Sequence, residues 1–385
     1  MYNQQEKQDN KNLTTKEGDI IPWLEKDYNN YLDKTTLIFG GTGSGKTTII
    51  EEILYLLKDH IPNFIVIAPK TSDSTYKSKL PARCIKEDFT KQQLKQLWDR
   101  QYAVTDIYNI ANKFEILEEL FNMIPNRESI IMIESIKRKA LQKIKEIETS
   151  FLDYGQKKAQ KLAIEESQKK HIKTIYKDTI RKNSFVLKSN LNLTAQQMIA
   201  IEYLDFNPRL GLIIDDSSEK FQKWMSYFKK NEDNIFGSIF YKNRWNYLTL
   251  IFAAHDDKVI NPEFRKNSRV TIYTGSVSLV TSLNRQGNGY TTKEKKDTMR
   301  YATRVFSNDE KSNIKTHQKL CYIREDAHPW KYTIAEPPPD FKLGCNPTIE
   351  LIANMPSNNE NNLKENPLAK KIIEEQTKKR KLNLN

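Results

Sequence analysis

Residues 40–47 have the types and the spacing that bind the phosphates of a nucleotide. They read GGTGSGKT and fit the pattern G-x-x-x-x-G-K-[ST] at every fixed position. Glycines permit positive φ angles and a close approach of the backbone, so that successive N–H groups can point at phosphate oxygens. A helix that starts directly after the glycines adds the partial positive charge of its N-terminus. The pattern therefore predicts a phosphate-binding loop, called the P-loop below.

The residues of this loop have different expected roles. The Lys46 ammonium should reach the β and γ phosphates of ATP, and the Thr47 hydroxyl should bind Mg²⁺. The other nucleotide contacts are expected from the backbone and the small side chains of Gly40, Gly41, Thr42, Gly43, Ser44, Gly45 and Thr48. ATP and Mg²⁺ are therefore the predicted cofactors.

Two further apolar segments end in side chains that could complete a hydrolytic site. Residues 210–216 read LGLIIDD, and residues 247–254 are followed by His255. We expect Asp215 to hold the hydrated Mg²⁺ opposite Thr47, and Asp216 to orient or deprotonate the attacking water. His255 could sense the γ-phosphate or could be an ordinary loop residue.

These side chains require parallel strands to position them. Apolar runs at residues 36–39, 63–69, 210–216, 247–254 and 270–275 read as buried strands, and residues 48–57 read as the helix after the P-loop. Periodic apolar residues predict helices at 90–100 and 109–123, and alternating runs at 320–323 and 331–334 predict a β-hairpin. The expected fold is an α/β P-loop NTPase with a RecA-like, mainly parallel sheet flanked by helices.

The composition of the chain indicates the kind of partner that it binds and its cellular setting. The formal net charge is +13 and the isoelectric point is near 9.3, which favours a polyanionic partner. No run of about 18 apolar residues is present, so we expect no membrane span, and the polar N-terminus has no signal-peptide core. Cys84, Cys321 and Cys345 form neither a zinc pattern nor an even disulfide framework, which is typical of a reducing, intracellular setting.

The distribution of charge and apolar residues predicts four parts. Residues 1–33 form a polar, loosely packed N-terminal arm, residues 34–126 and 205–340 form the ATPase core, residues 127–204 form a basic α-helical insertion, and residues 341–385 form a flexible tail with a basic patch at 378–381. Residues 127–188 contain 16 Lys or Arg against 8 Asp or Glu. This insertion is either a solvated helical hairpin or a basic arm that contacts nucleic acid or a neighbouring subunit.

The order of these segments resembles the DNA-packaging ATPases of large double-stranded DNA viruses, which are P-loop motors of the FtsK–HerA class. The resemblance covers residues 35–275 apart from the basic insertion, and it rests on the P-loop, VIAPKTSDSTY, IIDD and NRWNYLTLIFAAHDDKVINPEFRKN. Arg244 matches the family's Arg, Pro262 its Pro, and Arg265 with Asn267 its R-x-N segment. Trp245 stands where the family usually has His, and His255 stands where it has a sensor Gln.

The resemblance implies a homo-oligomeric ring that pumps double-stranded viral DNA into a capsid, with a capsid or portal protein as partner. DNA would be held through its phosphates. In the family each site is completed by an arginine from the neighbouring subunit, and either Arg244 or Arg265 could supply it here. The implied location is the host cytoplasm or nucleus where virions assemble, or the virion itself.

Two alternatives remain beside this function, and a third is disfavoured. The chain could be another DNA translocase or helicase-like motor, or a nucleotide-binding assembly scaffold with little turnover. A GTPase switch would need an N/T-K-x-D motif for reading the base, and this motif does not occur in the sequence.

Overall fold

The computed structural model describes residues 12–69, 73–88, 90–190, 192–217, 221–223, 235–288, 290–306, 318–347 and 350. Contacts divide the chain into two units, the first formed by residues 1–102 with 208–385 and the second by residues 103–207. The predicted basic patch at 378–381 lies outside the described residues.

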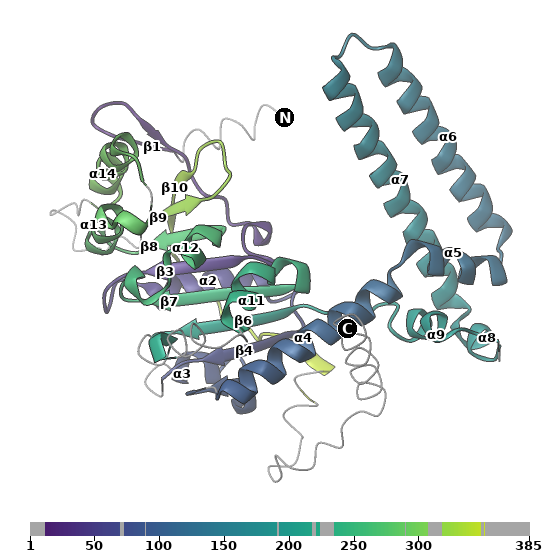
Figure 1. Ribbon diagram of the computed structural model, residues 1–385, viewed down its shortest axis with the longest axis horizontal. Helices are drawn as coiled ribbons and strands as arrows, with labels where there is room; N and C mark the ends of the chain where they lie inside the picture. The colour runs from purple at the N-terminus through teal and green to yellow at the C-terminus, as the bar shows by residue number, and fades with distance from the viewer. Residues whose placement is uncertain are drawn as a thin grey trace, which may run out of the picture. The chain divides into compact units, whose positions relative to one another are not determined.

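The first unit is built on a sheet whose strand order, among the described residues, is β10-β9-β8-β3-β7-β6-β4-β5 (Figure 1). The strands are β3 (Thr35–Phe39), β4 (Asn63–Ile67), β5 (Ile85–Lys86), β6 (Leu210–Asp215), β7 (Leu248–Ala254), β8 (Val270–Tyr273), β9 (Gln318–Ile323) and β10 (Trp330–Ile334). The pairs from β5 to β8 are parallel, and β8, β9 and β10 pair antiparallel. The predicted mainly parallel α/β sheet and its closing hairpin are confirmed.

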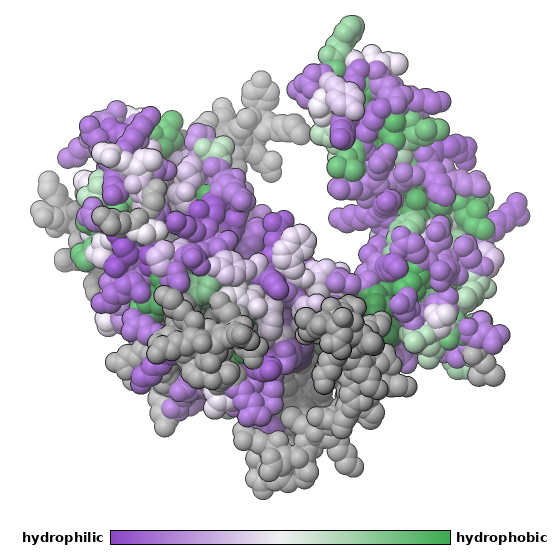
Figure 2. Space-filling view, in the orientation of Figure 1, coloured by the Kyte–Doolittle hydropathy of each residue, from purple (hydrophilic) through white to green (hydrophobic). Residues whose placement is uncertain are grey.

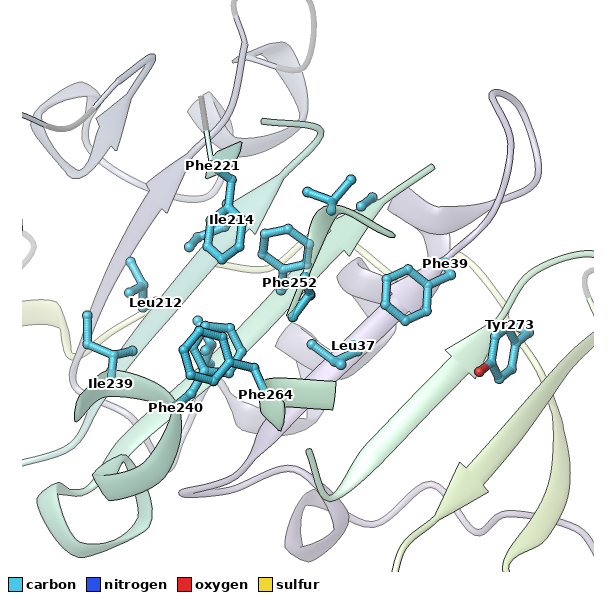
Figure 3. Packing of buried hydrophobic residues seen from close by; sticks show 14 of the residues in the cluster. Leu37, Phe39, Leu212, Ile214, Phe221, Ile239, Phe240, Phe252, Phe264 and Tyr273 are labelled. Carbon is cyan, nitrogen blue, oxygen red and sulfur yellow. The ribbon is translucent and has the colours of Figure 1, made fainter. Parts of the chain in front are cut away.

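The central strands are apolar because both faces of the sheet are covered. All residues of β3, β6 and β7 are buried. On one face Phe252 packs with Leu37, Ile214 and Phe221, and the rings of Phe240 and Phe264 stack with centroids 4.7 Å apart (Figure 3). The side chains of the opposite face, which include Ile38, Ile213 and Ile251, pack against α2 (Lys46–Leu57).

Helices and short 3-10 turns connect the strands of the first unit. They are η1 (Tyr28–Asn30), α2, α3 (Asp73–Lys77), η3 (Ala82–Cys84), α4 (Lys91–Ala111, which continues beyond residue 102), α11 (Ile235–Lys242), η4 (Arg244–Asn246), η5 (Asp257–Val259), α12 (Pro262–Asn267), α13 (Ser276–Asn284), η6 (Gln286–Asn288) and α14 (Thr292–Phe306). No helix in the described part of the chain is long and apolar enough to cross a membrane.

The segment before β3 differs from the expected loose arm. Residues 12–33 contain a two-stranded ribbon, β1 (Leu13–Thr14) and β2 (Ile20–Ile21), and bury the side chains of Ile21, Leu24 and Tyr31. The backbone N–H of Leu24 donates to the carbonyl of Tyr332, and the N–H of Tyr332 donates to the carbonyl of Pro22. The few apolar residues of this polar segment thus attach it to β10, which composition alone did not indicate. Beyond residue 340, Leu343 is also buried.

The second unit is entirely helical in its described residues. It comprises α5 (Phe114–Met123), α6 (Arg127–Thr149), α7 (Tyr154–Lys182), α8 (Ser184–Lys188) and α9 (Ala195–Glu202). It starts at Ala103, whereas the sequence suggested residue 127 as the start of the insertion. The reason is that α5 belongs to its core, where Leu117 and Phe121 pack with Ile172 and Tyr176 of α7. The periodicity of α5 indicated a buried face but not which helix covers it.

The strand order decides which residues meet at the site. In parallel strands the carboxyl ends lie at one edge of the sheet, and β7 lies between β3 and β6. Phe39 pairs with Ala254, and Asp215 pairs with Ala253. The P-loop, His255 and the acid pair therefore leave three adjacent strands at the same edge.

We expect Gly211→Ala to destabilise the first unit by about 1–3 kcal/mol because it overpacks a filled core. Gly211 lies opposite Phe64 on β4, and a Cβ at Gly211 would lie 2.3 Å from the Cδ1 atom of the Phe64 ring. Urea denaturation would measure the change. In a Phe64→Ala background the cost of Gly211→Ala should fall, and an equal cost in both backgrounds would contradict the clash. Gly275→Ala, where a Cβ meets no atom within 4 Å, is the matched control.

Candidate active site

The P-loop has a backbone that requires its glycines. Gly43 and Gly45 have φ angles of +72° and +83°, in the left-handed region that side chains disfavour. Gly40 has no room for a side chain, because a Cβ there would lie 1.7 Å from the Thr274 Oγ1 atom. The helix α2 starts at Lys46, directly after the loop. The N-terminus of this helix thus lies directly at the end of the loop.

Lys46 is buried and holds three contacts at the loop. Its Nζ donates to the carbonyl oxygens of Gly40 at 2.8 Å and Gly41 at 3.0 Å, and lies 3.3 Å from His255 Nδ1. Burial lowers the pKa of Lys46, and the nearby carboxylates of Asp216 and Asp215 oppose this shift. Phosphate oxygens of a nucleotide could replace these oxygen and nitrogen acceptors of the Lys46 ammonium.

His255 connects the P-loop lysine to the acid pair. Its Nε2 lies 2.9 Å from Asp216 Oδ1, while its Nδ1 faces the Lys46 ammonium. Since an ammonium can only donate, Nδ1 accepts, and Nε2–H then donates to the carboxylate. Asp216 has a φ of +50°, a left-handed conformation that Asp tolerates better than most residues. This turn directs Asp216 towards His255 rather than along the strand.

Asp215 is buried beside this bridge. Its Oδ2 accepts a hydrogen bond of 2.8 Å from the hydroxyl of Tyr76 in α3. Burial raises the pKa of Asp215, and the hydrogen bond from Tyr76 opposes that rise. A carboxylate at a strand end and the half-buried Thr47 hydroxyl in the first turn of α2 are the hard oxygen donors that Mg²⁺ prefers. The donor set therefore fits this ion.

The two predicted arginines have different surroundings. Arg265 is buried, and its guanidinium donates to the carbonyls of Asp257 and Ile260 and lies 3.8 Å from the Asp257 carboxylate. It is occupied inside its own subunit. Arg244 is exposed in η4, which precedes β7 and so lies at the opposite edge of the sheet from the P-loop. Among the residues that the structure describes, no hydrogen bond or ion pair joins either arginine to Lys46, His255 or the acid pair.

Three residues at the site were not among the sequence predictions. They are Tyr76, Thr274 and Lys319. Thr274 follows β8, and its position after an apolar strand was a usable signal. Tyr76 ends the VIAPKTSDSTY segment that supports the family resemblance, but no role at the site was expected of it. Lys319 is one lysine beside an apolar run and had no recognisable pattern.

Lys319 and Thr274 hold the tip of the P-loop from two adjacent strands. The Nζ of Lys319 donates to the carbonyl of Ser44 at 2.9 Å, and the Ser44 hydroxyl lies 2.5 Å from Thr274 Oγ1. Lys319 precedes Leu320, which pairs with Tyr273, so its side chain starts next to Thr274. Burial lowers the pKa of Lys319 to about 8. The sheet thus supplies a second buried ammonium behind the loop.

We expect Lys319→Met to weaken ATP binding about tenfold, because it removes a charge-assisted hydrogen bond and a positive charge from behind the P-loop. Titration with a fluorescent ATP analogue would measure the dissociation constant. Wild-type affinity should fall more between pH 7 and pH 9 than that of the variant, since Lys319 loses its proton with a pKa of about 8.

Two controls separate this role from simple loss of packing. Lys319→Arg keeps the charge and should retain most of the affinity. Lys331→Met removes a lysine from β10 that pairs with Asp326 instead, and it should bind ATP like the wild type. Equal affinities of Lys319→Met and the wild type at both pH values would contradict the assignment.

The chain is similar in sequence to a viral protein. No model of a protein family matches the sequence. The uncharacterized protein B354L of African swine fever virus is 28% identical over 333 residues in a pig isolate from Kenya, which covers 82% of this chain and 85% of the relative. B354L of a tick isolate from Malawi is 28% identical over 331 residues, with the same coverage of both chains.

The solved structures to which the chain is similar are distant. The genome packaging NTPase B204 of Sulfolobus turreted icosahedral virus 2 aligns with 82% of this chain and 100% of its own, at 13% identity and a TM-score of 0.35. The bacterial conjugative coupling protein TrwB aligns with 86% of this chain and 89% of its own, at 11% identity and a TM-score of 0.32. By its strand order and its P-loop the chain is a P-loop NTPase in fold, and over most of its length it is similar to a protein of African swine fever virus.

Proposed function

We propose that the chain hydrolyses ATP at the P-loop and uses the energy to move double-stranded DNA during viral genome packaging. The observation that carries the hydrolytic part is the bridge from Lys46 through His255 to Asp216, which connects a phosphate-binding lysine to a carboxylate able to activate water. The viral relative and the order of motifs support the packaging part.

Nucleotide binding would rearrange this bridge. The β and γ phosphates would take the Lys46 ammonium from the carbonyls of Gly40 and Gly41 and from His255 Nδ1. Thr47 and Asp215 would hold Mg²⁺, which supplies positive charge to the phosphates when it is bound. His255 would then be free to report the γ-phosphate to Asp216 through its Nε2 hydrogen bond. This gives His255 a sensing role in place of the usual Gln.

Asp216 is the proposed base for the attacking water. Its carboxylate is partly exposed at the carboxyl edge, whereas Asp215 is buried and accepts from Tyr76. The two acids therefore have different surroundings: one can reach water, and the other can hold a cation. The hydrogen bond from His255 fixes the direction of the Asp216 carboxylate.

The DNA-binding part of the proposal rests on charge. A formal net charge of +13 suits contacts to phosphates, which hold DNA without reading its sequence. The position of Arg244 supports the proposed ring of subunits. An exposed guanidinium at the opposite edge from its own P-loop is too far from its own nucleotide site, but it could reach the nucleotide of a neighbouring subunit, where it would stabilise the charge of the transition state.

The first test is steady-state ATPase activity with and without long double-stranded DNA. Wild-type turnover should rise severalfold with duplex DNA. Lys46→Ala should abolish ATP binding. Asp216→Asn should lower turnover by about 10²–10⁴-fold but should still bind ATP. His255→Gln should keep most of the activity, because an amide can also accept from Lys46 and donate to Asp216, whereas His255→Ala should lose it. Turnover that ignores DNA would refute a DNA motor and favour a nucleotide-binding scaffold.

The second test mixes two inactive variants. Arg244→Ala and Asp216→Asn should each be inactive, and a mixture should regain activity where an intact Arg244 faces an intact Asp216 site. The mixture recovers nothing if both residues act within one subunit. Arg304→Ala, which removes an arginine of α14 that donates to the carbonyl of Thr14, is the matched surface control and should leave turnover unchanged.

A further inference from the structure

The hairpin of α6 and α7 has two halves that differ in packing. In the half near α5, the side chains of Ile133, Ile172, Tyr176 and Ile180 are buried in the core of the second unit. In the other half, no side chain between residues 141 and 171 is buried. Helices are normally stable only when an apolar stripe is covered. Half of this hairpin therefore presents an apolar seam that its own unit covers only in part.

The seam contains a groove between the two helices. A hollow of about 420 Å³ is lined by Ile136, Ala140, Ala163 and Ile164, with Lys139, Lys143, Ser167, Gln168 and His171 around them. A second hollow of about 340 Å³ shares Lys143 and Ile164 with the first and extends towards Leu152. An apolar cavity of about 150 Å³ accommodates benzene, so the groove has room for several apolar side chains. Hydrophobic residues can be seen among hydrophilic ones along this hairpin in Figure 2.

The charges around the groove are mostly positive. The larger hollow is lined by two lysines one helical turn apart and by no carboxylate, and His171 Nδ1 contacts the carbonyl of Ser167 in its own helix. Glu146 lines the smaller hollow, and Glu148 forms an ion pair with Lys161 near the tip. Over residues 136–171 there are 10 Lys or Arg and 5 Asp or Glu, a net charge of +5. The groove thus combines an apolar floor with a cationic rim.

These properties discriminate among the possible occupants. DNA would satisfy the lysines, but its backbone offers no apolar surface to cover Ile136 and Ile164. A second copy of the hairpin would cover them but would bring like charges together. We propose that the groove binds an amphipathic helix of a partner protein whose apolar face is flanked by Asp and Glu. This is the helix-in-groove mode of recognition, with apolar anchors in the hollows and carboxylates on Lys139 and Lys143.

The inference extends beyond the proposed function, because it concerns the second unit and holds whether or not the chain hydrolyses ATP. The full-length protein would be titrated with two synthetic peptides of about 20 residues, long enough to form isolated helices. Both peptides have the same Leu face, one with Glu and the other with Lys on the flanks. Fluorescence anisotropy should show binding of the Glu peptide and at least tenfold weaker binding of the Lys peptide.

Charge-reversal variants then locate the site. Lys139→Glu with Lys143→Glu should weaken the Glu peptide about tenfold and improve the Lys peptide. Lys169→Glu with Lys170→Glu makes the same change of net charge at two exposed lysines of α7 that do not line the hollows, and it should weaken the Glu peptide less. Circular dichroism would verify that both double variants keep their helices.

Four outcomes would overturn the proposal, three in these titrations and one with a variant that fills the groove. In the first, the Glu peptide does not bind. In the second, both double variants weaken the binding of the Glu peptide equally. In the third, Lys139→Glu with Lys143→Glu lowers the affinity of the protein for duplex DNA but not for the Glu peptide. The third result would make the groove a nucleic-acid surface. Ala163→Trp, which fills the larger hollow without changing charge, should also block the Glu peptide, and unchanged binding would show that the apolar floor is not used.

Discussion

The pairing of β7 between β3 and β6 is the constraint on which the site depends. Neighbouring strands lie about 4.8 Å apart, so the P-loop strand and the strand of the acid pair are separated by roughly 10 Å. One intervening residue must span that distance if the lysine and the carboxylate are to be connected. His255 does so because it follows β7 and because its two ring nitrogens point to opposite sides, one towards Lys46 and one towards Asp216.

The same sheet also sets the shape of the P-loop before any nucleotide arrives. Two glycines in the left-handed backbone conformation allow the loop to turn. Thr274 after β8 and Lys319 in β9 hold Ser44 in place. A loop held in this way does not have to be ordered by its ligand, which lowers the cost of binding. The two buried ammonium groups, Lys46 and Lys319, lie in a setting that lowers the pKa of both. Anionic phosphates would stabilise their charged forms.

The two units bury their apolar side chains to different extents. In the first unit the sheet is covered on both faces, and its polar groups gather at one edge. In the second unit, one half of the α6–α7 hairpin packs into a helical core. In the other half, the apolar side chains between the two helices are half-exposed and lysines lie around them. The candidate active site therefore lies in the first unit, and the groove proposed to bind a partner lies in the second.

The sequence alone determined the features that depend on neighbouring residues. The P-loop, its helix, the buried strands and the strand-end acids follow from local patterns, and so does the helical character of the insertion. The tertiary structure decided which of these meet. Strand order brought His255 between Lys46 and Asp216, buried Arg265 inside its own subunit, and left Arg244 exposed at the far edge. It also brought Tyr76 and Lys319 to the site and attached residues 12–33 to β10. Contacts between residues far apart in the chain leave no periodicity or spacing in the sequence, because they arise only when the strands pair.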